Sequence, residues 1–174
     1  FALTGLSALI LSACVGSGFK TEYDPLPSDL TAAWRLAEVR VSVPKSLSVS
    51  EEEVLLPKAD IVWREDPEGD RHAQVAAIMK NAVTLGARDL RGARPVVIEV
   101  TVTRFHALTF LAEQSKVDWG VHNIRFDARV LDAQSGAVLL DMVDIRAELP
   151  RRTQQREREQ VGRDGIGRRG PEGI

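Results

Sequence analysis

Alternation of apolar and polar side chains is the clearest pattern along the middle of the chain, and it predicts β-strands. Residues 36–43 place Val39, Val41 and Val43 on one face, and Pro44 ends the pattern. A short apolar run at 59–63 (ADIVW) predicts a further strand, and longer alternation follows later in the chain. The predicted strands lie at 36–43, 59–63, 95–103, 119–131 and 137–148.

The last two predicted strands form the most secure pair. Between 122 and 130 the even positions make one face, and the odd positions make a polar face of Asn123, Arg125, Asp127 and Arg129. The connection at 132–136 has hairpin-loop composition, and Gly136 can adopt a positive φ there. The return strand is expected to place Val143, Ile145 and Ala147 on one face and Asp144, Arg146 and Glu148 on the other.

One segment has helical periodicity instead. Apolar side chains recur every three to four residues from Val75 to Leu85, which gives a single apolar stripe. Asp70 stands at the N-cap position, and Gly86 can cap the other end. A helix is therefore predicted over 70–86. The element order β-β-α-β-β-β indicates an α+β fold, with a mostly antiparallel sheet of about five strands and the helix packed on one face.

The beginning of the chain has the features of an export signal. Residues 1–13 are uncharged and apolar, and they are shorter than the roughly 20 residues that cross a bilayer. They end in Leu11-Ser12-Ala13-Cys14, the pattern of a bacterial lipobox, in which small residues admit the peptidase and a thiol receives diacylglycerol. We expect cleavage between Ala13 and Cys14 and a lipid anchor of acyl chains such as palmitate on Cys14. The signal is expected to lack its own start, since the chain begins at Phe1.

The residue after Cys14 bears on location. Asp at this position tends to retain lipoproteins at the inner membrane, and Val15 is not Asp, which favours the periplasmic side of the outer membrane. The periplasmic face of the inner membrane is the alternative. Residues 14–33 are expected to be a lipidated, flexible tether, because much of the segment is rich in Gly, Ser and Pro. A single α+β domain is expected over 34–149.

Composition and charge limit the classes of molecule that the protein is expected to bind. The formal net charge is -2, and the positive excess lies in a tail, 150–174, with seven Arg against four acidic residues. No nucleic-acid partner is expected, because such binding needs cations clustered on folded structure. The tail is expected to be disordered. The alternative is a frame-shifted artefact, since Gly/Arg-rich runs are typical of GC-rich DNA read out of frame.

A search for chemistry finds no catalytic, cofactor-binding or metal-binding set. Hydrolase elbows, phosphate loops and HExxH are absent, and an acylated Cys14 is no nucleophile. A metal site of His106, His122 and Asp118 is the enzymatic alternative. The plainer interpretation places His72 in an exposed first helical turn and the other two histidines at strand ends. Glu51-Glu52-Glu53 is interpreted as a solvated loop rather than a cation site, and Trp34 and Trp63 as core or rim residues rather than a ligand groove.

Several segments together resemble an uncharacterised family of short lipoproteins from the Rhodobacter group of marine and photosynthetic alphaproteobacteria. They are LSAC (11–14), WRL (34–36) leading to VSVP (41–44), ADIVW (59–63), GDRHAQV (69–75), RPVVIEVTV and RFHALT (94–109), and VHNIRFDARVLDAQSG (121–136). The resemblance implies a location and a fold over about 5–149, and it implies no catalytic residues. It also implies helical sequence beyond the final strand, from which the tail departs.

These observations favour a membrane-anchored, non-enzymatic envelope accessory factor that binds a protein partner. The alternative is a lipid or small-ligand binding module, with an apolar pocket between helix and sheet lined by residues such as Met79 and Phe126. A metal-dependent enzyme is the third possibility.

Overall fold

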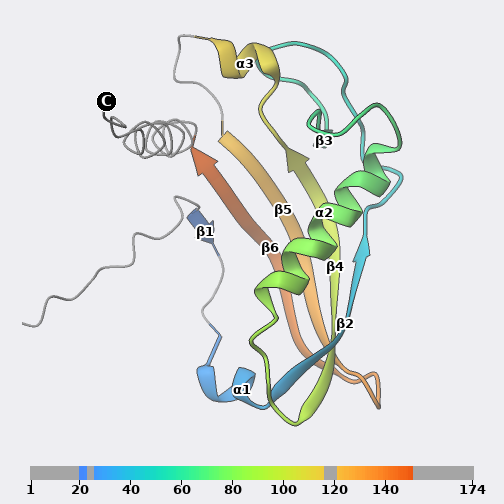
Figure 1. The fold of residues 1–174 in the computed structure, drawn as a ribbon, viewed down its shortest axis with the longest axis vertical. Helices are drawn as coiled ribbons and strands as arrows, with labels where there is room; N and C mark the ends of the chain where they lie inside the picture. The colour runs from blue at the N-terminus through green and yellow to red at the C-terminus, as the bar shows by residue number, and fades with distance from the viewer. Residues whose placement is uncertain (1–19, 23–25, 116–120, 151–174) are drawn as a thin grey trace, which may run out of the picture.

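A computed structural model of the chain describes residues 20–22, 26–115 and 121–150, and Figure 1 shows how their elements are arranged. The α+β class predicted from the sequence is confirmed, with one long helix, α2, lying across one face of a sheet. The elements are β1 (Lys20–Glu22), α1 (Ser28–Ala32), β2 (Trp34–Ser42), β3 (Ile61–Val62), α2 (Arg71–Gly86), β4 (Arg94–His106), α3 (Phe110–Gln114), β5 (Val121–Asp132) and β6 (Val138–Pro150).

The sheet is mixed, and antiparallel pairs predominate in it as expected. Its strand order is β1-β6-β5-β4-β2, and β3 pairs with β4 beyond the end of β2. The pairs β4/β5, β5/β6 and β1/β6 are antiparallel, whereas β2 and β3 run parallel to β4. Parallel neighbours need a long crossover, and here α2 belongs to it.

The ends of α2 follow local capping chemistry. The Asp70 side chain accepts a hydrogen bond from the Ala73 N–H at 3.1 Å, which confirms the predicted N-cap. The helix ends at Gly86 as expected, although the C-cap position itself is occupied by Ala87. The hairpin loop also matches its prediction, because Gly136 has a φ of 73°.

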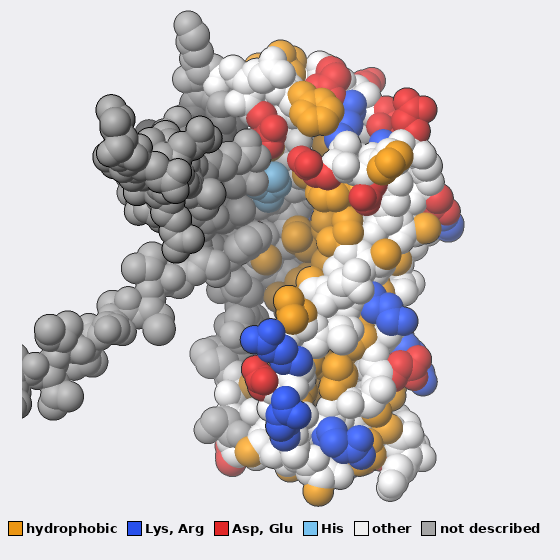
Figure 2. All heavy atoms as spheres, in the orientation of Figure 1, with side chains coloured by type: hydrophobic (Ala, Val, Ile, Leu, Met, Phe, Trp, Pro, Cys, Tyr) orange, Lys and Arg blue, Asp and Glu red, His pale blue; other side chains and the backbone are white. Residues whose placement is uncertain are grey.

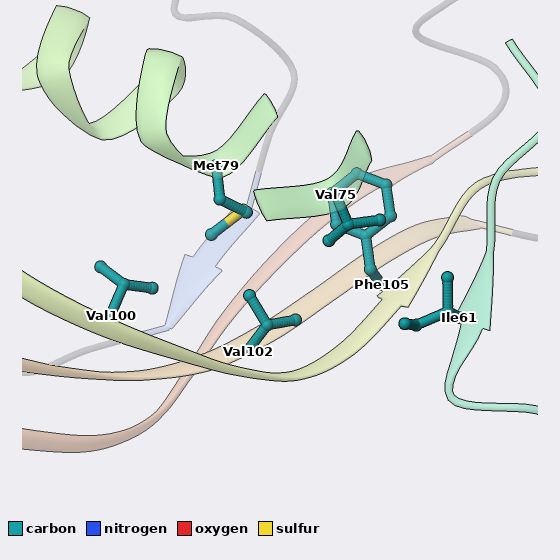
Figure 3. Close-up of a cluster of buried hydrophobic side chains, with 6 residues drawn as sticks. All are labelled: Ile61, Val75, Met79, Val100, Val102 and Phe105. Atoms are coloured by element: carbon teal, nitrogen blue, oxygen red, sulfur yellow. The ribbon is translucent and has the colours of Figure 1, made fainter. Parts of the chain in front are cut away.

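Side chains from α2 and β4 form the main hydrophobic core, as Figure 3 shows. Val75 and Met79 on α2 lie over Val102 and Phe105 on β4, and Ile61 of β3 closes one end. All five side chains are nearly inaccessible to solvent. Burying each of them contributes about 1.5–3 kcal/mol, so the contact between α2 and β4 is a main source of stability.

A second cluster lies near the start of β4. Trp34, Val96 and Val130 bury one another there, one from each of β2, β4 and β5. The turn before β4 approaches β2 closely, with the Gly92 N–H donating to the Trp34 carbonyl at 2.6 Å. This contact fixes the parallel alignment of β2 and β4 at their first residues.

Three sequence expectations need correction or refinement, and the short helix α3 was not predicted. The Thr109 side chain caps α3 by accepting from the Ala112 N–H. Val143 is 76% exposed rather than sharing the face of Ile145, because the β5/β6 register shifts between Phe126 and Ala128. His72 is half-buried, with a ring nitrogen 3.1 Å from the Leu47 carbonyl. Within the expected tether, β1 pairs with β6, and α1 precedes β2.

The face covered by α2 carries charges of both signs. Acidic side chains gather toward its upper end, and basic side chains lie mainly over its lower half (Figure 2). Among the described residues, no helix is long and apolar enough to cross a membrane.

Candidate anion-binding site

Three arginines lie side by side across the sheet on the face opposite α2. Arg104 of β4 is in register with Arg125 of β5, and Arg125 is in register with Arg146 of β6. Each has a neighbour in sequence that packs in the core on the other face, namely Phe105, Ile124 and Ile145. Side chains alternate between the two faces of a strand, so all three arginines point away from α2.

A β-bulge gives Arg104 this position. The register between β4 and β5 shifts between Val102 and Arg104. Strict alternation from Val102 would send Arg104 into the core and Phe105 out of it. The extra residue reverses the alternation, which buries Phe105 and places Arg104 beside Arg125.

The three guanidinium groups differ in how they are satisfied. Arg146 is held by the Asp144 carboxylate, to which its Nε donates at 3.0 Å. By contrast, the Nε atoms of Arg104 and Arg125 are buried and make no hydrogen bond within the described part of the chain. Buried polar groups in proteins are nearly always hydrogen-bonded, so these two donors mark a place for an acceptor.

A cavity of about 690 Å³ opens beside Arg104 and Arg125. Its charged and polar lining includes Lys58, His106 and Asn123 together with the two arginines. The cavity is also lined by Ser48, Leu55, Leu56, Pro57, Ala59, Asp60, Ala107, Leu108 and Thr109. We call this cavity the basic pocket, since three cationic side chains meet one carboxylate in its walls.

That carboxylate, Asp60, is already engaged. Its Oδ2 accepts hydrogen bonds from the backbone N–H and the hydroxyl of Ser48, both at 2.8 Å. These bonds hold the pKa of Asp60 below its usual value, with Arg104 contributing a smaller electrostatic effect. Asp60 therefore remains ionised and joins the two ends of the loop of residues 48–60, while Arg104 keeps donors to spare.

His106 is neutral and has both ring nitrogens occupied. Arg104 Nη2 lies 3.2 Å from Nδ1, and since a guanidinium can only donate, Nδ1 must be the acceptor. The proton is therefore on Nε2, which donates to the Ala59 carbonyl. Burial lowers the pKa of His106 and keeps the ring uncharged. The imidazole thus orients Arg104 and has no free nitrogen for proton transfer.

The acidic run at 51–53 is exposed to solvent, as predicted, and two of its carboxylates also form ion pairs. Arg71, 5% exposed, donates to both Glu51 carboxylate oxygens, from Nε at 2.8 Å and from Nη2 at 3.3 Å. Arg64 donates to Glu53 at 2.6 Å. Arg71 also donates to the carbonyls of Asp66 and Pro67, so the run ties a surface loop to the start of α2. Arg64 also has a buried Nε and Nη2 without a hydrogen bond among the described residues, but its guanidinium is paired with the carboxylates of Glu51 and Glu53 and lines no cavity with Arg104. This cluster therefore serves structure.

The structure separates the residues of the possible metal site. His106 pairs in register with Asn123, so it shares the face opposite α2 with that residue. His122 precedes Asn123 and lies on the other face. Asp118 lies outside the described residues, as do Ala13, Cys14 and the tail after Pro150. Within the described ranges, no group of three or more His, Cys, Asp or Glu side chains is placed to hold a metal ion.

The aromatic and apolar candidates belong to the core. Trp34 is buried, and Trp63 packs edge-on against Phe105 with ring centroids 5.7 Å apart. Met79 is buried in the main cluster, and Phe126 packs against that cluster. Trp63, Met79 and Phe126 occupy the interface between α2 and the sheet, where the ligand-binding alternative placed a pocket.

The basic pocket itself was missed by sequence reasoning. Alternation assigned Arg125 to the polar face of its strand, which is correct. The partnership of Arg125 with Arg104 depends on the β4/β5 register and on the bulge, and neither has a local sequence signal. The one available hint was an arginine, Arg104, two residues before the histidine that ends a strand.

A known protein family covers most of the chain. A model described as a family of unknown function (DUF6778) matches residues 34–169. The chain belongs to this family. The DUF6778 match begins at the first residue of β2 and includes every residue of the basic pocket, and it brings no activity with it.

More distant comparisons add little. No curated protein matches the sequence significantly. Among solved structures, a dodecamer of a PelC variant from Paraburkholderia phytofirmans is similar at 15% identity, over 76% of this chain and 78% of that one, with a TM-score of 0.32. A similarity this low bears on neither the fold nor the function of the present chain.

Proposed function

We propose that this protein is a non-enzymatic binding module that holds an anionic ligand in the basic pocket. The observation that carries the proposal is that Arg104 and Arg125 line one cavity and that the buried Nε of each makes no hydrogen bond within the described residues. A phosphate or carboxylate could accept hydrogen bonds from both guanidinium groups at once. Charge-assisted hydrogen bonds of this kind contribute about 1.5–3 kcal/mol each.

Electrostatics supports the same conclusion. Like charges directly opposite each other on neighbouring strands are destabilising. A bound anion would offset the repulsion between Arg104 and Arg125, so the basic pocket favours a negatively charged ligand. The binding role is favoured over catalysis because both nitrogens of His106, the titratable base in the pocket wall, are engaged.

We further propose that the module works at the cell envelope, held by a lipid on Cys14 at the periplasmic side of the outer membrane. The lipobox Leu11-Ser12-Ala13-Cys14 supports this location. Labelled palmitate should be incorporated by cells that express the protein and lost with Cys14→Ser. Label retained by that variant would exclude the anchor. An accessory role toward an envelope protein is the function we infer for the anchored module.

Anion binding can be measured directly on the full chain carrying Cys14→Ser, which cannot be acylated. Inorganic phosphate should raise Tm relative to sodium chloride of equal ionic strength, because ligands that bind only the folded state stabilise it. The Arg104→Gln/Arg125→Gln double variant should lose this response. Arg129→Gln is the matched control, since Arg129 shares the strand and face of Arg125 but pairs with Glu99. An equal phosphate response in the double variant, or none in the parent, would exclude the pocket as the site.

A further inference from the structure

We infer that the ligand of the basic pocket is a small anionic amphiphile, with a phosphate or carboxylate head and an aliphatic tail. The inference rests on the proposed function, because the arginines that bind an anion would bind its head. The inference also takes account of the other side of the basic pocket, whose wall is apolar.

The apolar wall consists of Leu55, Leu56, Pro57 and Leu108. Leu108 is buried, while Leu55 and Leu56 are 42% and 64% exposed. Two consecutive leucines beside the cavity therefore expose apolar surface to water, which is unfavourable. An aliphatic chain lying against them would remove that surface from water.

The loop that carries these leucines is fastened on both sides. Before it, the Val54 carbonyl accepts from the Thr109 hydroxyl at 2.9 Å, near the start of α3. After it, the Ala59 carbonyl accepts from His106 and Asp60 accepts from Ser48. The leucines are therefore held at the rim of the pocket by bonds that do not involve their own side chains.

The two walls have different origins, which gives the pocket a polar side and an apolar side. Arg104 and Arg125 project from the sheet, and Leu55 and Leu56 project from the loop. A ligand spanning both must carry charge at one end only. The volume of about 690 Å³ lies within the roughly 300–1,000 Å³ range of small-molecule sites and is sufficient for a head group with a short chain.

A free amphiphile fits better than an extended polyanion. Asp60 lines the same cavity, and the chain as a whole has a net charge of -2. A ligand with several charged groups would meet the carboxylate or the leucines, whereas a single head group meets the two arginines. The apolar wall also distinguishes the expected ligand from inorganic phosphate.

The test is isothermal titration of the full Cys14→Ser chain with inorganic phosphate and with butyl, hexyl and octyl phosphate, each below its micelle concentration. Affinity should rise about threefold to fourfold for each methylene buried against the leucines. Octyl glucoside, which has the same chain and no charge, should bind at least tenfold more weakly than octyl phosphate.

Variants separate the two walls. Leu55→Ser/Leu56→Ser should abolish the dependence on chain length while phosphate still binds. Both side chains are exposed, so the fold should tolerate the change. Leu85→Ser on α2 is the matched control, because Leu85 is 61% exposed and does not line the pocket. Arg104→Gln/Arg125→Gln should weaken every anionic ligand at least tenfold.

The possible outcomes distinguish the amphiphile inference from the proposal of anion binding on which it rests. Phosphate binding that does not strengthen with chain length overturns the amphiphile and leaves the anion site intact. Failure of every anion to bind overturns both. Octyl glucoside binding as tightly as octyl phosphate, or binding only to phosphatidylglycerol vesicles and never to free octyl phosphate, also overturns the inference.

Discussion

Arg104 of β4 and Arg125 of β5 are direct cross-strand partners on the sheet face opposite α2. Arg146 continues the row but is neutralised by Asp144, which the bulge in β6 brings beside it with a φ of 53°. One of the three arginines is thus neutralised by a carboxylate of the protein itself. The other two, Arg104 and Arg125, line the cavity, and this coincidence distinguishes a binding site from a surface cluster of charges.

The repulsion between Arg104 and Arg125 should lower the stability of the folded protein. Arg125→Gln should increase the free energy of unfolding by about 0.5 kcal/mol at low ionic strength without a binding anion, because a like-charge cross-strand pair is removed. The gain should shrink as salt screens the repulsion. Urea unfolding at about 20 mM and about 500 mM sodium chloride measures both effects. A loss of stability as large as that of Arg129→Gln, which breaks the pair with Glu99, would contradict this account.

His106 should make stability fall at mildly acidic pH. Burial lowers its pKa in the folded protein, so below about 6.5 the unfolded chain takes up a proton that the folded chain does not. Stability is therefore lost as the pH falls through this range. Nitrogen-15 NMR of the imidazole should show the Nε2–H tautomer and a titration midpoint below the ordinary value. Urea unfolding of His106→Gln should lack this part of the pH dependence, and a midpoint at or above the ordinary value would refute it.

Asp132 should govern a second, more acidic transition. The N–H of Ser135, the Arg94 guanidinium and the N–H of Gln134 all donate to its carboxylate, and they hold its pKa well below the usual range. A lowered pKa adds stability above the unfolded value near 3.8, and this is lost as the pH falls below it.

Thermal unfolding between about pH 7 and pH 2 can detect the contribution of Asp132. Asp132→Asn should lower Tm at neutral pH and flatten its acid dependence. Asp141→Asn, an exposed carboxylate on β6, is the control and should leave the profile near that of the parent. Identical profiles for the parent and Asp132→Asn would show that the hairpin does not depend on this charge.

Two glycines should respond oppositely to alanine. A Cβ on Gly92 would lie 2.1 Å from the Ala33 carbonyl carbon and 2.5 Å from the Trp34 nitrogen, so the backbone joining β2 and β4 must move. Overpacking of this kind costs about 1–3 kcal/mol or more. Gly86 has nothing within 4 Å of its Cβ position, and Gly86→Ala should stabilise α2 by up to about 1 kcal/mol. Urea unfolding of the two alanine variants measures both effects. Equal changes in the free energy of unfolding would mean that the close approach of Gly92 to Ala33 and Trp34 is not required.

Local patterns were sufficient for much of the fold. Alternation placed β2, β4, β5 and β6 near their observed positions, and the Asp70 cap with the apolar stripe predicted α2 to within one residue at its start. Gly136 followed from hairpin chemistry. These features depend on neighbours within a few residues, and for that reason the sequence reveals them.

Longer-range features were not predictable in this way. The parallel pairing of β2 with β4 depends on where α2 crosses and on the contact of Gly92 with Trp34. The burial of Arg71 depends on Glu51, twenty residues earlier in the chain. The exposure of Val143 depends on a bulge, which one extra residue creates at a point that alternation does not mark.

The sequence by itself therefore determined the α+β class, strands β2 to β6, the main helix and the lipobox hypothesis at Cys14. Only the tertiary structure decided which side chains meet. The basic pocket joins β4, β5 and the loop of residues 48–60, segments that lie tens of residues apart. Their meeting is set by strand register and by one bulge, because a shift of a single residue would turn Arg104 into the core and remove the pocket.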